Sequence, residues 1–409
     1  MMIVSISWKN IWRNKTRSWV VILAIGFGLF GTLFMIALMN GLMEQKIDAS
    51  ISNETSSIQV HTPEFLENKS IDHLIEDVPS VITRIRQTDG IKAVCHRIKA
   101  SGMASTAISG NGVMINGIEP EKEKDVTDIH RSLVKGSYFE KSFRNIPTIL
   151  IGSKLAKKLN AGVGSKVVIT IQDTGGELTS GLYRVVGIFK TSNSMFDETN
   201  VFVERKSMES LTGVRPTQTS EIAVLLKNNE MTEEVTRALQ KKLPGLSVMS
   251  WKDIDPTVVA MVSLLEQFSY FMVLIIMVAL TFVIVNAMLM AILERTRELG
   301  MLMAIGMNKR KICMMILTET TFLAVTGAIL GILISFIVIK VTQQQGINFA
   351  AWAEGFEQLG YSALIHPTVQ TYFYIFIGLI SILTAAVASI WPARKALKLE
   401  PAKAVREDV

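Results

Sequence analysis

The chain has 409 residues, 49% of them hydrophobic, and its mean hydropathy is +0.35. This composition excludes an ordinary water-soluble protein, because the apolar residues are concentrated in four long blocks with almost no charge. The net charge of +6 does not indicate a nucleic-acid partner, since the basic residues next to the apolar blocks explain much of it. The two cysteines, Cys95 and Cys313, provide neither a disulfide scaffold nor a zinc site.

The first 18 residues predict a short amphipathic helix at the cytoplasmic membrane surface. Residues 1–18 contain four basic residues and no acidic one, and Trp8, Trp12 and Trp19 recur at helical spacing. A long apolar block follows, without the small-residue cleavage site that ends a secretory signal. We therefore expect an uncleaved first span over residues 19–43.

Residues 44–267 predict a large mixed α/β domain. Gly, Pro, Asn and Asp separate its apolar runs, as turns require, and the first span is expected to continue as a helix to about residue 53. We expect strands at 57–61, 91–101, 167–172, 183–189, 221–226 and 246–251, and helices at 78–87 and 232–243. Two β-α-β pieces on either side of a strand-rich insert indicate one domain with two lobes.

Three further apolar blocks complete the predicted four-helix membrane part. The remaining spans are expected at 268–293, 314–341 and 371–391, with a connector at 294–313, a short loop at 342–370 and a tail at 392–409. Each block is long enough to cross the hydrocarbon core as a helix. The connector and the tail are rich in Lys and Arg, whereas the short loop has neither. The positive-inside rule therefore places both termini and the connector in the cytoplasm, and the α/β domain outside.

The sequence contains no clear catalytic pattern. HExxH, GxSxG and Walker A motifs are absent, and none of the five histidines falls in a span, so we expect a protein that is not an enzyme. We also expect no buried Asp, Glu, Lys or Arg in the spans, which argues against an ion-coupled transporter or a channel. Asn286, well inside the second span, is expected to hydrogen-bond to a neighbouring helix.

Small residues predict close packing between the spans. Gly28 shares one face of the first span with Ala24 and Thr32, and Gly327 and Gly331 form a GxxxG pattern in the third. Such faces allow helices to approach closely within one chain or between chains, so the number of subunits stays open.

The connector between the second and third spans has the most distinctive sequence. Leu299, Leu302 and Ile305 are expected to line one side of a short helix, which charged residues precede and Gly306 and Asn308 end. From the residues alone, two interpretations stay open. The helix docks in a groove of another protein and transmits a movement, or it lies passively at the membrane interface.

Residues 295–306, Arg-Thr-Arg-Glu-Leu-Gly-Met-Leu-Met-Ala-Ile-Gly, resemble the coupling segment of the FtsX-like and MacB-like ABC transporter permeases. Residues 391–396 and 399–406 resemble the C-terminal signature of that family. In the outer domain, the resemblance to this family extends to residues 136–139, 151–159, 164–168 and 185–189. The resemblance implies that an ATPase subunit is contacted by Arg295, Arg297, Glu298, Leu299, Gly300, Leu302, Ala304, Ile305 and Gly306.

Within the family, residues 38–42 and 58–61 are most similar to the lipoprotein-releasing, or Lol-type, permeases. That resemblance implies an outer domain with a porter-like and a sabre-like lobe, and a dimer of two identical or different permease subunits among the lipids of the bacterial inner membrane. A separate ABC ATPase dimer would bind ATP and Mg²⁺, whereas this chain would bind no cofactor. ATP hydrolysis would move the outer domains and release lipoproteins from the membrane to a periplasmic carrier.

Two alternatives stay open within the family: a permease for macrolide or peptide efflux, and an FtsX-like regulator of a cell-wall hydrolase. One departure from the Lol pattern bears on the choice. The Lol subunit that recruits the lipoprotein carrier has a longer, proline-containing hook at the place of residues 173–181, which are short and lack proline here. This difference argues against direct docking of a carrier, and it favours the hook-less Lol subunit or a different cargo.

Overall fold

The computed structural model describes residues 7–8, 11–13, 15–65, 71–139, 146–358 and 361–397. Contacts within the chain define two compact units. The helical unit consists of Met1–Met43, Ser263–Asn348 and Leu364–Val409, and the α/β unit consists of Glu44–Val262 and Phe349–Ala363. The α/β unit therefore contains a second segment that the sequence analysis assigned to the loop at 342–370.

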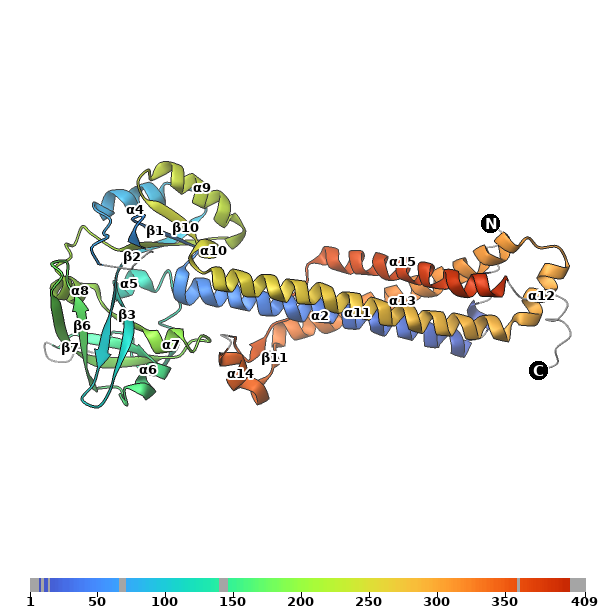
Figure 1. Ribbon diagram of the computed structural model, residues 1–409, viewed down its shortest axis with the longest axis horizontal. Coiled ribbons are helices and arrows are strands. Elements are labelled where there is room, and N and C mark those ends of the chain that lie inside the picture. The colour runs from blue at the N-terminus through green and yellow to red at the C-terminus, as the bar shows by residue number, and fades with distance from the viewer. Residues whose placement is uncertain are drawn as a thin grey trace. The chain divides into compact units, whose positions relative to one another are not determined.

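Four long helices form the core of the helical unit. They are α2 (Lys15–Ser50), α11 (Pro256–Glu294), α13 (Lys309–Gln345) and α15 (Thr371–Ala396). All four are long and apolar enough to cross a membrane, which confirms the prediction of four spans, and Figure 1 shows them running alongside one another. Each helix extends beyond its expected span, because backbone hydrogen bonding continues into polar residues at the ends of the apolar blocks.

Two smaller elements complete the helical unit. The short helix α12 (Thr296–Ala304) lies between α11 and α13, and a two-stranded ribbon of β11 (Ile347–Asn348) and β12 (Leu364–Ile365) lies between α13 and α15. The structure describes the expected N-terminal helix only in part. Trp8 packs edge-on against Trp12 and Phe322, with ring centroids 6.2 and 5.4 Å apart. Residues 1–6, 9–10 and 14, and the tail 398–409 with the expected signature at 399–406, lie outside the described residues.

Glycines allow α13 to pack closely against α2. A Cβ atom on Gly331 would lie 2.7 Å from the carbonyl oxygen of Gly26, and one on Gly327 would lie 2.9 Å from a carbonyl oxygen of α2. Gly28, by contrast, packs against α11, where a Cβ atom would lie 2.7 Å from Cδ1 of Leu280. The small-residue pattern thus marks two different helix contacts, and the sequence analysis did not identify Gly26.

Replacing Gly331 by alanine should destabilise the helical unit, because the added methyl group would clash with the backbone of α2. Overpacking of this kind costs about 1–3 kcal/mol. The matched control is Gly31→Ala on α2, where nothing lies within 4 Å of the added atom. Thermal unfolding in detergent micelles should show a lower midpoint for Gly331→Ala alone, and equal midpoints for the two variants would contradict the packing described here.

The structure does not place Asn286 in a contact between helices of this chain. Its side chain is exposed on α11, and no hydrogen bond joins it to another residue in the described part of the chain. The reason is its position around the helix. Ile284 and Met288 face the bundle interior, and Asn286 lies two residues from each of them, which turns it to the opposite side. The prediction of interhelical packing by Asn286 is therefore wrong within one chain.

The α/β unit is built on a ten-stranded sheet. The strands are β1 (Ile58–His61), β2 (Ile91–Ser105), β3 (Gly110–Ile118), β4 (Leu133–Gly136), β5 (Thr148–Gly152), β6 (Lys166–Gln172), β7 (Leu178–Phe189), β8 (Asn200–Glu204), β9 (Glu221–Leu226) and β10 (Ser247–Ser250). Their order is β10-β1-β9-β2-β3-β8-β5-β7-β4, and β6 pairs with both β2 and β7.

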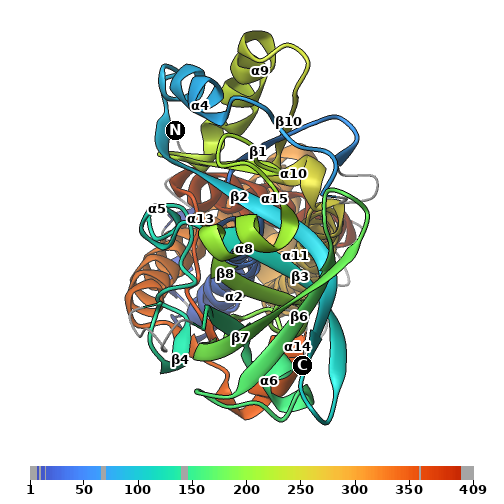
Figure 2. The ribbon, with the colours of Figure 1, turned by 90° about the vertical axis from the view of Figure 1, so that its left-hand side faces the viewer.

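The long strand β2 belongs to two lobes of this sheet, as Figure 2 shows. Its first half pairs with β9, in a lobe whose apolar core lies between β1, β9, β10 and two helices, α4 (Val78–Arg86) and α9 (Thr232–Lys242). Its second half pairs with β3 and β6, in a lobe that includes α6 (Ser153–Lys158) and α8 (Arg205–Thr212). The prediction of an α/β domain with two lobes is confirmed.

Short helical segments connect the strands. They are the π-helical turn η1 (Ile51–Thr55), the helices α5 (Pro120–Glu123), α7 (Phe196–Thr199), α10 (Trp251–Ile254) and α14 (Ala353–Gln358), and the 3-10 turns η2 (Asn229–Met231) and η3 (Ala350–Trp352). The sequence analysis did not anticipate these segments, because helices of one turn leave little periodic signal.

The hairpin between β6 and β7 has a shorter loop than expected. The two strands stay paired as far as Gln172 and Leu178, so only residues 173–177 form the loop, in place of the expected 173–181. The Asp173 side chain accepts hydrogen bonds from the backbone amides of Gly175 and Glu177, each at 2.9 Å. An aspartate that satisfies the amides of a tight turn in this way allows strand pairing to continue up to the turn.

Candidate functional site

The connector between α11 and α13 forms a sharply bounded helical turn. Arg295, with φ −110° and ψ 15°, interrupts the helix at the end of α11, and α12 begins at the next residue. Gly306 adopts a φ of +93°, which residues with a side chain rarely adopt. Asn308 then caps α13, because its side chain accepts a hydrogen bond from the backbone amide of Arg310 at 3.0 Å. Figure 1 shows α12 at the end of the helix bundle.

A buried ion pair holds the first residue of this turn. The Nη1 atom of Arg295 lies 2.9 and 3.2 Å from the two carboxylate oxygens of Glu319 on α13, and both side chains are largely buried. This finding corrects the expectation that the spans contain no buried charge. Glu319 was missed because it lies within the apolar block predicted as the third span, although a carboxylate at such a position itself requires a partner.

A second ion pair, closer to the surface, links α12 to the N-terminal segment. The guanidinium of Arg13 donates a hydrogen bond to the carboxylate of Glu298, and both side chains are about half exposed. Exposed pairs contribute little to stability, so this contact orients α12 more than it stabilises it. Arg295 and Glu298 thus fasten α12 to two different helical segments.

The sequence predicted that the apolar residues of the connector helix share one face. In the structure they do not. Leu299 is 5% exposed and packs in the core of the helical unit together with Ile316, and Leu302 packs at the edge of that core. Ile305 is 84% exposed. Positions 299 and 305 lie six residues apart, so on an α-helix their side chains point about 120° away from each other. The bundle can therefore bury Leu299 and leave Ile305 exposed.

The remaining residues of the predicted coupling segment divide in the same way. Gly300 is buried, whereas Arg297, Met301, Ala304 and Gly306 are exposed together with Ile305. A groove of about 420 Å³ runs along α12, and its lining includes both ion pairs and the side chains of Leu299, Leu302 and Ile305. The lining of the groove therefore combines apolar and charged side chains.

A second charged cluster lies inside the α/β unit, and the sequence analysis missed it. Arg97 on β2 stands directly opposite Glu221 on β9, and its Nη1 atom lies 2.8 Å from a carboxylate oxygen of Glu221. Its Nε and Nη2 atoms lie 3.1 and 2.7 Å from the carboxylate oxygens of Glu123. Lys99, two residues further along β2, donates to Glu221 at 2.8 Å. The available signal was the alternation of Arg97 and Lys99, which places both on one face of the strand.

The charges of this cluster are stabilised by one another. Burial by itself raises the pKa of Glu221, but Lys99, His61 and Arg97 together hold that pKa well below its ordinary value. Burial by itself lowers the pKa of Arg97, but the carboxylate of Glu123 more than reverses this effect, so the pKa lies above its ordinary value. Both groups therefore stay ionised although Arg97, Glu123 and Glu221 are each almost fully buried.

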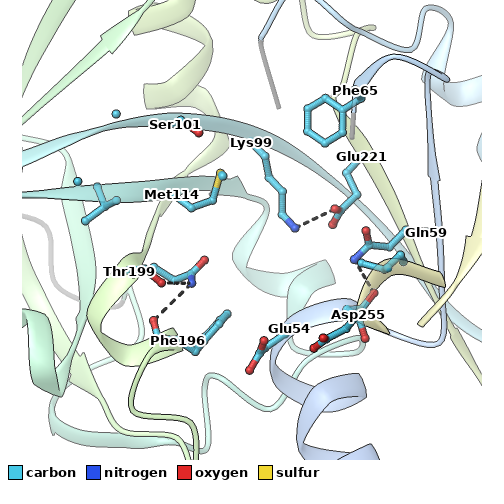
Figure 3. A pocket seen from close by; sticks show the side chains of 16 residues that line it. Glu54, Gln59, Phe65, Lys99, Ser101, Met114, Phe196, Thr199, Glu221 and Asp255 are labelled. Carbon is cyan, nitrogen blue, oxygen red and sulfur yellow. Dashed lines mark hydrogen bonds and ion pairs between the residues drawn. The ribbon is translucent and has the colours of Figure 1, made fainter. Parts of the chain in front are cut away.

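This cluster borders a cavity whose lining includes residues of both lobes. The cavity has a volume of about 590 Å³, and Figure 3 shows Lys99 and Glu221 on one side of it and the carboxylates of Glu54 and Asp255 on the other. Glu54 belongs to η1, which follows α2, and Asp255 directly precedes α11. Arg97 also approaches Ser56, the residue after η1, with 3.4 Å between Nη2 and Oγ. The charged cluster thus sits where the two long helices join the sheet.

Comparison with known proteins agrees with this architecture. The model of the MacB-like periplasmic core domain matches residues 18–242, and that of the FtsX-like permease C-terminal region matches residues 270–401. The lipoprotein-releasing system transmembrane protein LolC of Neisseria meningitidis is 22% identical over 96% of this chain and 95% of its own length. An uncharacterised ABC transporter permease of Methanocaldococcus jannaschii is 23% identical over 99% and 97%.

The Escherichia coli macrolide export ATP-binding/permease protein MacB is 25% identical over 95% of this chain, which spans 58% of the length of MacB. Four spanning helices and a two-lobed α/β domain define a multi-pass membrane permease. The chain belongs to the ABC transporter permease family with a MacB-like periplasmic core domain and an FtsX-like C-terminal region. The resemblance identified from the sequence is confirmed.

Proposed function

We propose that this chain is the permease subunit of an ABC transporter in the bacterial inner membrane, where it converts ATP hydrolysis by a separate ATPase dimer into motion of its α/β unit. ATP and Mg²⁺ bind to the ATPase, and this chain binds no cofactor. Two permease subunits work as a dimer. Both termini and α12 lie in the cytoplasm and the α/β unit lies in the periplasm, an orientation supported by the excess of Lys and Arg near α12.

The observation that carries this proposal is the arrangement of α12. Its inner face is held to the bundle by Leu299 and by the Arg295–Glu319 pair, whereas Met301, Ala304 and Ile305 are exposed. An exposed apolar residue next to a charged groove is typical of the centre of a protein interface. Because α12 is continuous in sequence with both α11 and α13, a partner that moves it would move both helices.

The charged cluster of the α/β unit supports transmission of that movement. The end of α2 reaches the cluster through Ser56, and the start of α11 faces the same cavity through Asp255. Buried ion pairs are favourable only at short, well-oriented distances between their charged groups. A displacement of either helix end would therefore move the sheet as a rigid body. Interfaces and packed cores change between discrete arrangements, which suits a mechanical subunit.

We propose lipid-anchored proteins as the cargo. The Neisseria relative, named for lipoprotein release, matches this chain over nearly the whole of both sequences. The short loop at residues 173–177 supports a subunit that does not itself receive a periplasmic carrier. Macrolide or peptide efflux is the second candidate, favoured by the match to the Escherichia coli macrolide exporter. An FtsX-like regulator of a cell-wall hydrolase is supported by the C-terminal match alone.

The coupling role is tested by Ile305→Arg in the chain coexpressed with its ABC ATPase partner. We expect loss of about 2 kcal/mol or more of binding free energy, roughly a 30-fold higher Kd, because a buried charge replaces an apolar contact. The matched control is Ile108→Arg in the α/β unit, where the side chain is 78% exposed. Both substitutions are at exposed positions and should leave the melting temperature unchanged. Unchanged ATPase binding by Ile305→Arg would remove α12 as the contact.

The cargo is tested with the same variants in proteoliposomes that contain a fluorescent acylated lipoprotein. The proposal requires ATP-dependent release by the wild-type complex and by the Ile108→Arg control, and none by Ile305→Arg. ATP-dependent movement of a macrolide, with the lipoprotein left in the membrane, would establish the efflux function in its place. Binding of a cell-wall hydrolase with neither activity would establish the regulatory one.

A further inference from the structure

The second lobe of the α/β unit contains a wide basic hollow, which we call the lysine hollow. Its volume is about 1000 Å³, and its lining combines Lys135 on β4, Lys154 and Lys157 on α6, and Lys190 after β7. Ser153, Asn160 and Ser194 add hydrogen-bonding groups. Among the described residues that line it, none is acidic. A concave surface with several cationic groups concentrates anions strongly.

The lysine hollow differs in kind from the other charged sites of this chain. Arg97 and Arg295 are buried against carboxylates, so their charges are neutralised inside the protein. Lys135 and Lys157 are instead exposed, and Lys154 is half-buried. Lys158, next to Lys157 on α6, points away from the hollow and pairs with Glu198. The lysines that line the hollow therefore present their charges to a common space.

Apolar and aromatic side chains lie at the rim of the hollow. Val134 and Val163 line it and are exposed, and Ala353 closes one side. Ala353 follows Trp352, which is 66% exposed and lies tilted against Phe349 at a centroid distance of 6.2 Å. Lysines beside exposed tryptophan and aliphatic groups are the composition of protein surfaces at the membrane–water interface.

The segment that contributes Ala353 to the hollow is connected in sequence to two candidate membrane spans. The segment Phe349–Ala363 belongs to the α/β unit but is joined to α13, which ends at Gln345, and to α15, which begins at Thr371. Both helices are candidate spans, so the segment between them returns to the membrane surface that it left. Ala353 therefore lies close in sequence to the end of a candidate span.

We propose that the lysine hollow binds the anionic headgroups of phospholipids in the membrane that the chain spans. The ammonium groups of Lys135, Lys154 and Lys157 pair with headgroup phosphates, and Trp352 lies at the depth of the headgroups. The contact gives the second lobe a foothold on the lipid surface. This inference requires that the chain spans a membrane and that the second lobe reaches the lipid surface, and it holds whichever cargo the transporter moves.

The test uses the full chain in nanodiscs of phosphatidylcholine alone or mixed with phosphatidylglycerol. An amine-reactive reagent is added, and mass spectrometry measures the modification rate of each lysine. Lys135, Lys154 and Lys157 should react about fivefold more slowly in the mixed discs, because each lysine gains a headgroup contact. Lys206, Lys227 and Lys241, which are exposed elsewhere in the unit, should react equally in both. High salt should remove the protection, since it screens charges.

A matched pair of triple variants completes the test. Replacing Lys135, Lys154 and Lys157 by glutamine should lower the amount of phosphatidylglycerol retained in native mass spectrometry, whereas replacing Lys206, Lys227 and Lys241 by glutamine removes the same charge and should leave it unchanged. Equal loss in both variants would overturn the proposal. So would protection by inorganic phosphate in discs of phosphatidylcholine, which would indicate a soluble anion, or protection only after the ATPase is added, which would indicate a protein interface.

Discussion

Replacing Arg97 by methionine is expected to destabilise the α/β unit by about 3–5 kcal/mol at neutral pH, the usual cost of leaving a buried charge without its partner. Methionine fills most of the volume of arginine but cannot donate to Glu123 or Glu221, which are almost fully buried. Lys99 still pairs with Glu221, so the main cost arises at Glu123. Adding Glu123→Gln should recover part of the loss, because the unpaired carboxylate is then neutral.

Hydrogen exchange of β2 and β9 in the full chain measures this effect. The expected loss corresponds to exchange that is faster by about two to four orders of magnitude. The control is Arg131→Met, which breaks an exposed pair with Asp128 and should change exchange very little. If Arg97→Met behaves like this control, the cluster does not stabilise the sheet, and the proposed path of movement from α2 loses its support.

The same cluster predicts a pH dependence. Because the pKa of Glu221 is lower in the folded protein than in the unfolded chain, its contribution to stability is fully present above the ordinary carboxyl pKa of about 4.3. That contribution is lost as the pH falls through the lowered folded pKa. The difference in stability between wild type and Arg97→Met should accordingly shrink in acid, where the buried carboxylates of the variant become protonated.

Replacing Arg295 by leucine is the second change with a large expected effect. It removes the guanidinium that donates to both carboxylate oxygens of Glu319 and leaves that carboxylate buried in the helical unit. We expect a loss of about 3–5 kcal/mol, seen as a lower thermal unfolding midpoint in detergent micelles. Glu319→Leu should cost less, because the long side chain of Arg295 can reach water when its partner is absent.

The double variant separates stability from coupling. Arg295→Leu combined with Glu319→Leu removes both charges, and its melting temperature should return close to that of the wild type. The double variant also frees the start of α12, so ATPase stimulation should stay low although the fold is restored. Arg310→Leu, at an exposed position in the same connector, serves as the control for charge. Full stimulation by the double variant would show that the pair only stabilises the bundle.

The four membrane helices could be predicted from the sequence, because hydropathy depends only on residues that are adjacent in the chain. A stretch of apolar residues must cross the bilayer as a helix whatever the rest of the chain does. The exact ends could not be predicted: α11 begins at Pro256, before the expected residue 268, because the mixed apolar and polar residues 256–267 continue the helix. For the same reason α2 continues through Ser50 before it changes to the π-helical turn η1.

The sheet of the α/β unit was only partly accessible. The β9, α9 and β10 elements were predicted because alternating and amphipathic patterns are strong there. Strand β3 was missed because its glycines resemble a turn, and β5 and β8 are short and fully paired inside the sheet. Strand order was beyond reach, since β3 pairs with β8 across about eighty residues of chain that form other strands.

At the candidate site, the sequence by itself determined which segment to examine and which residues bound it. Gly306 ends the turn through its backbone conformation and Asn308 begins α13 through its capping side chain, so local rules suffice. Only the tertiary structure decided that Leu299 faces the bundle and Ile305 faces away, and that Arg295 meets Glu319 on α13. The physical reason is that burial and ion pairing depend on neighbours brought together by packing, whereas helix formation, capping and membrane insertion depend on residues already adjacent in the chain.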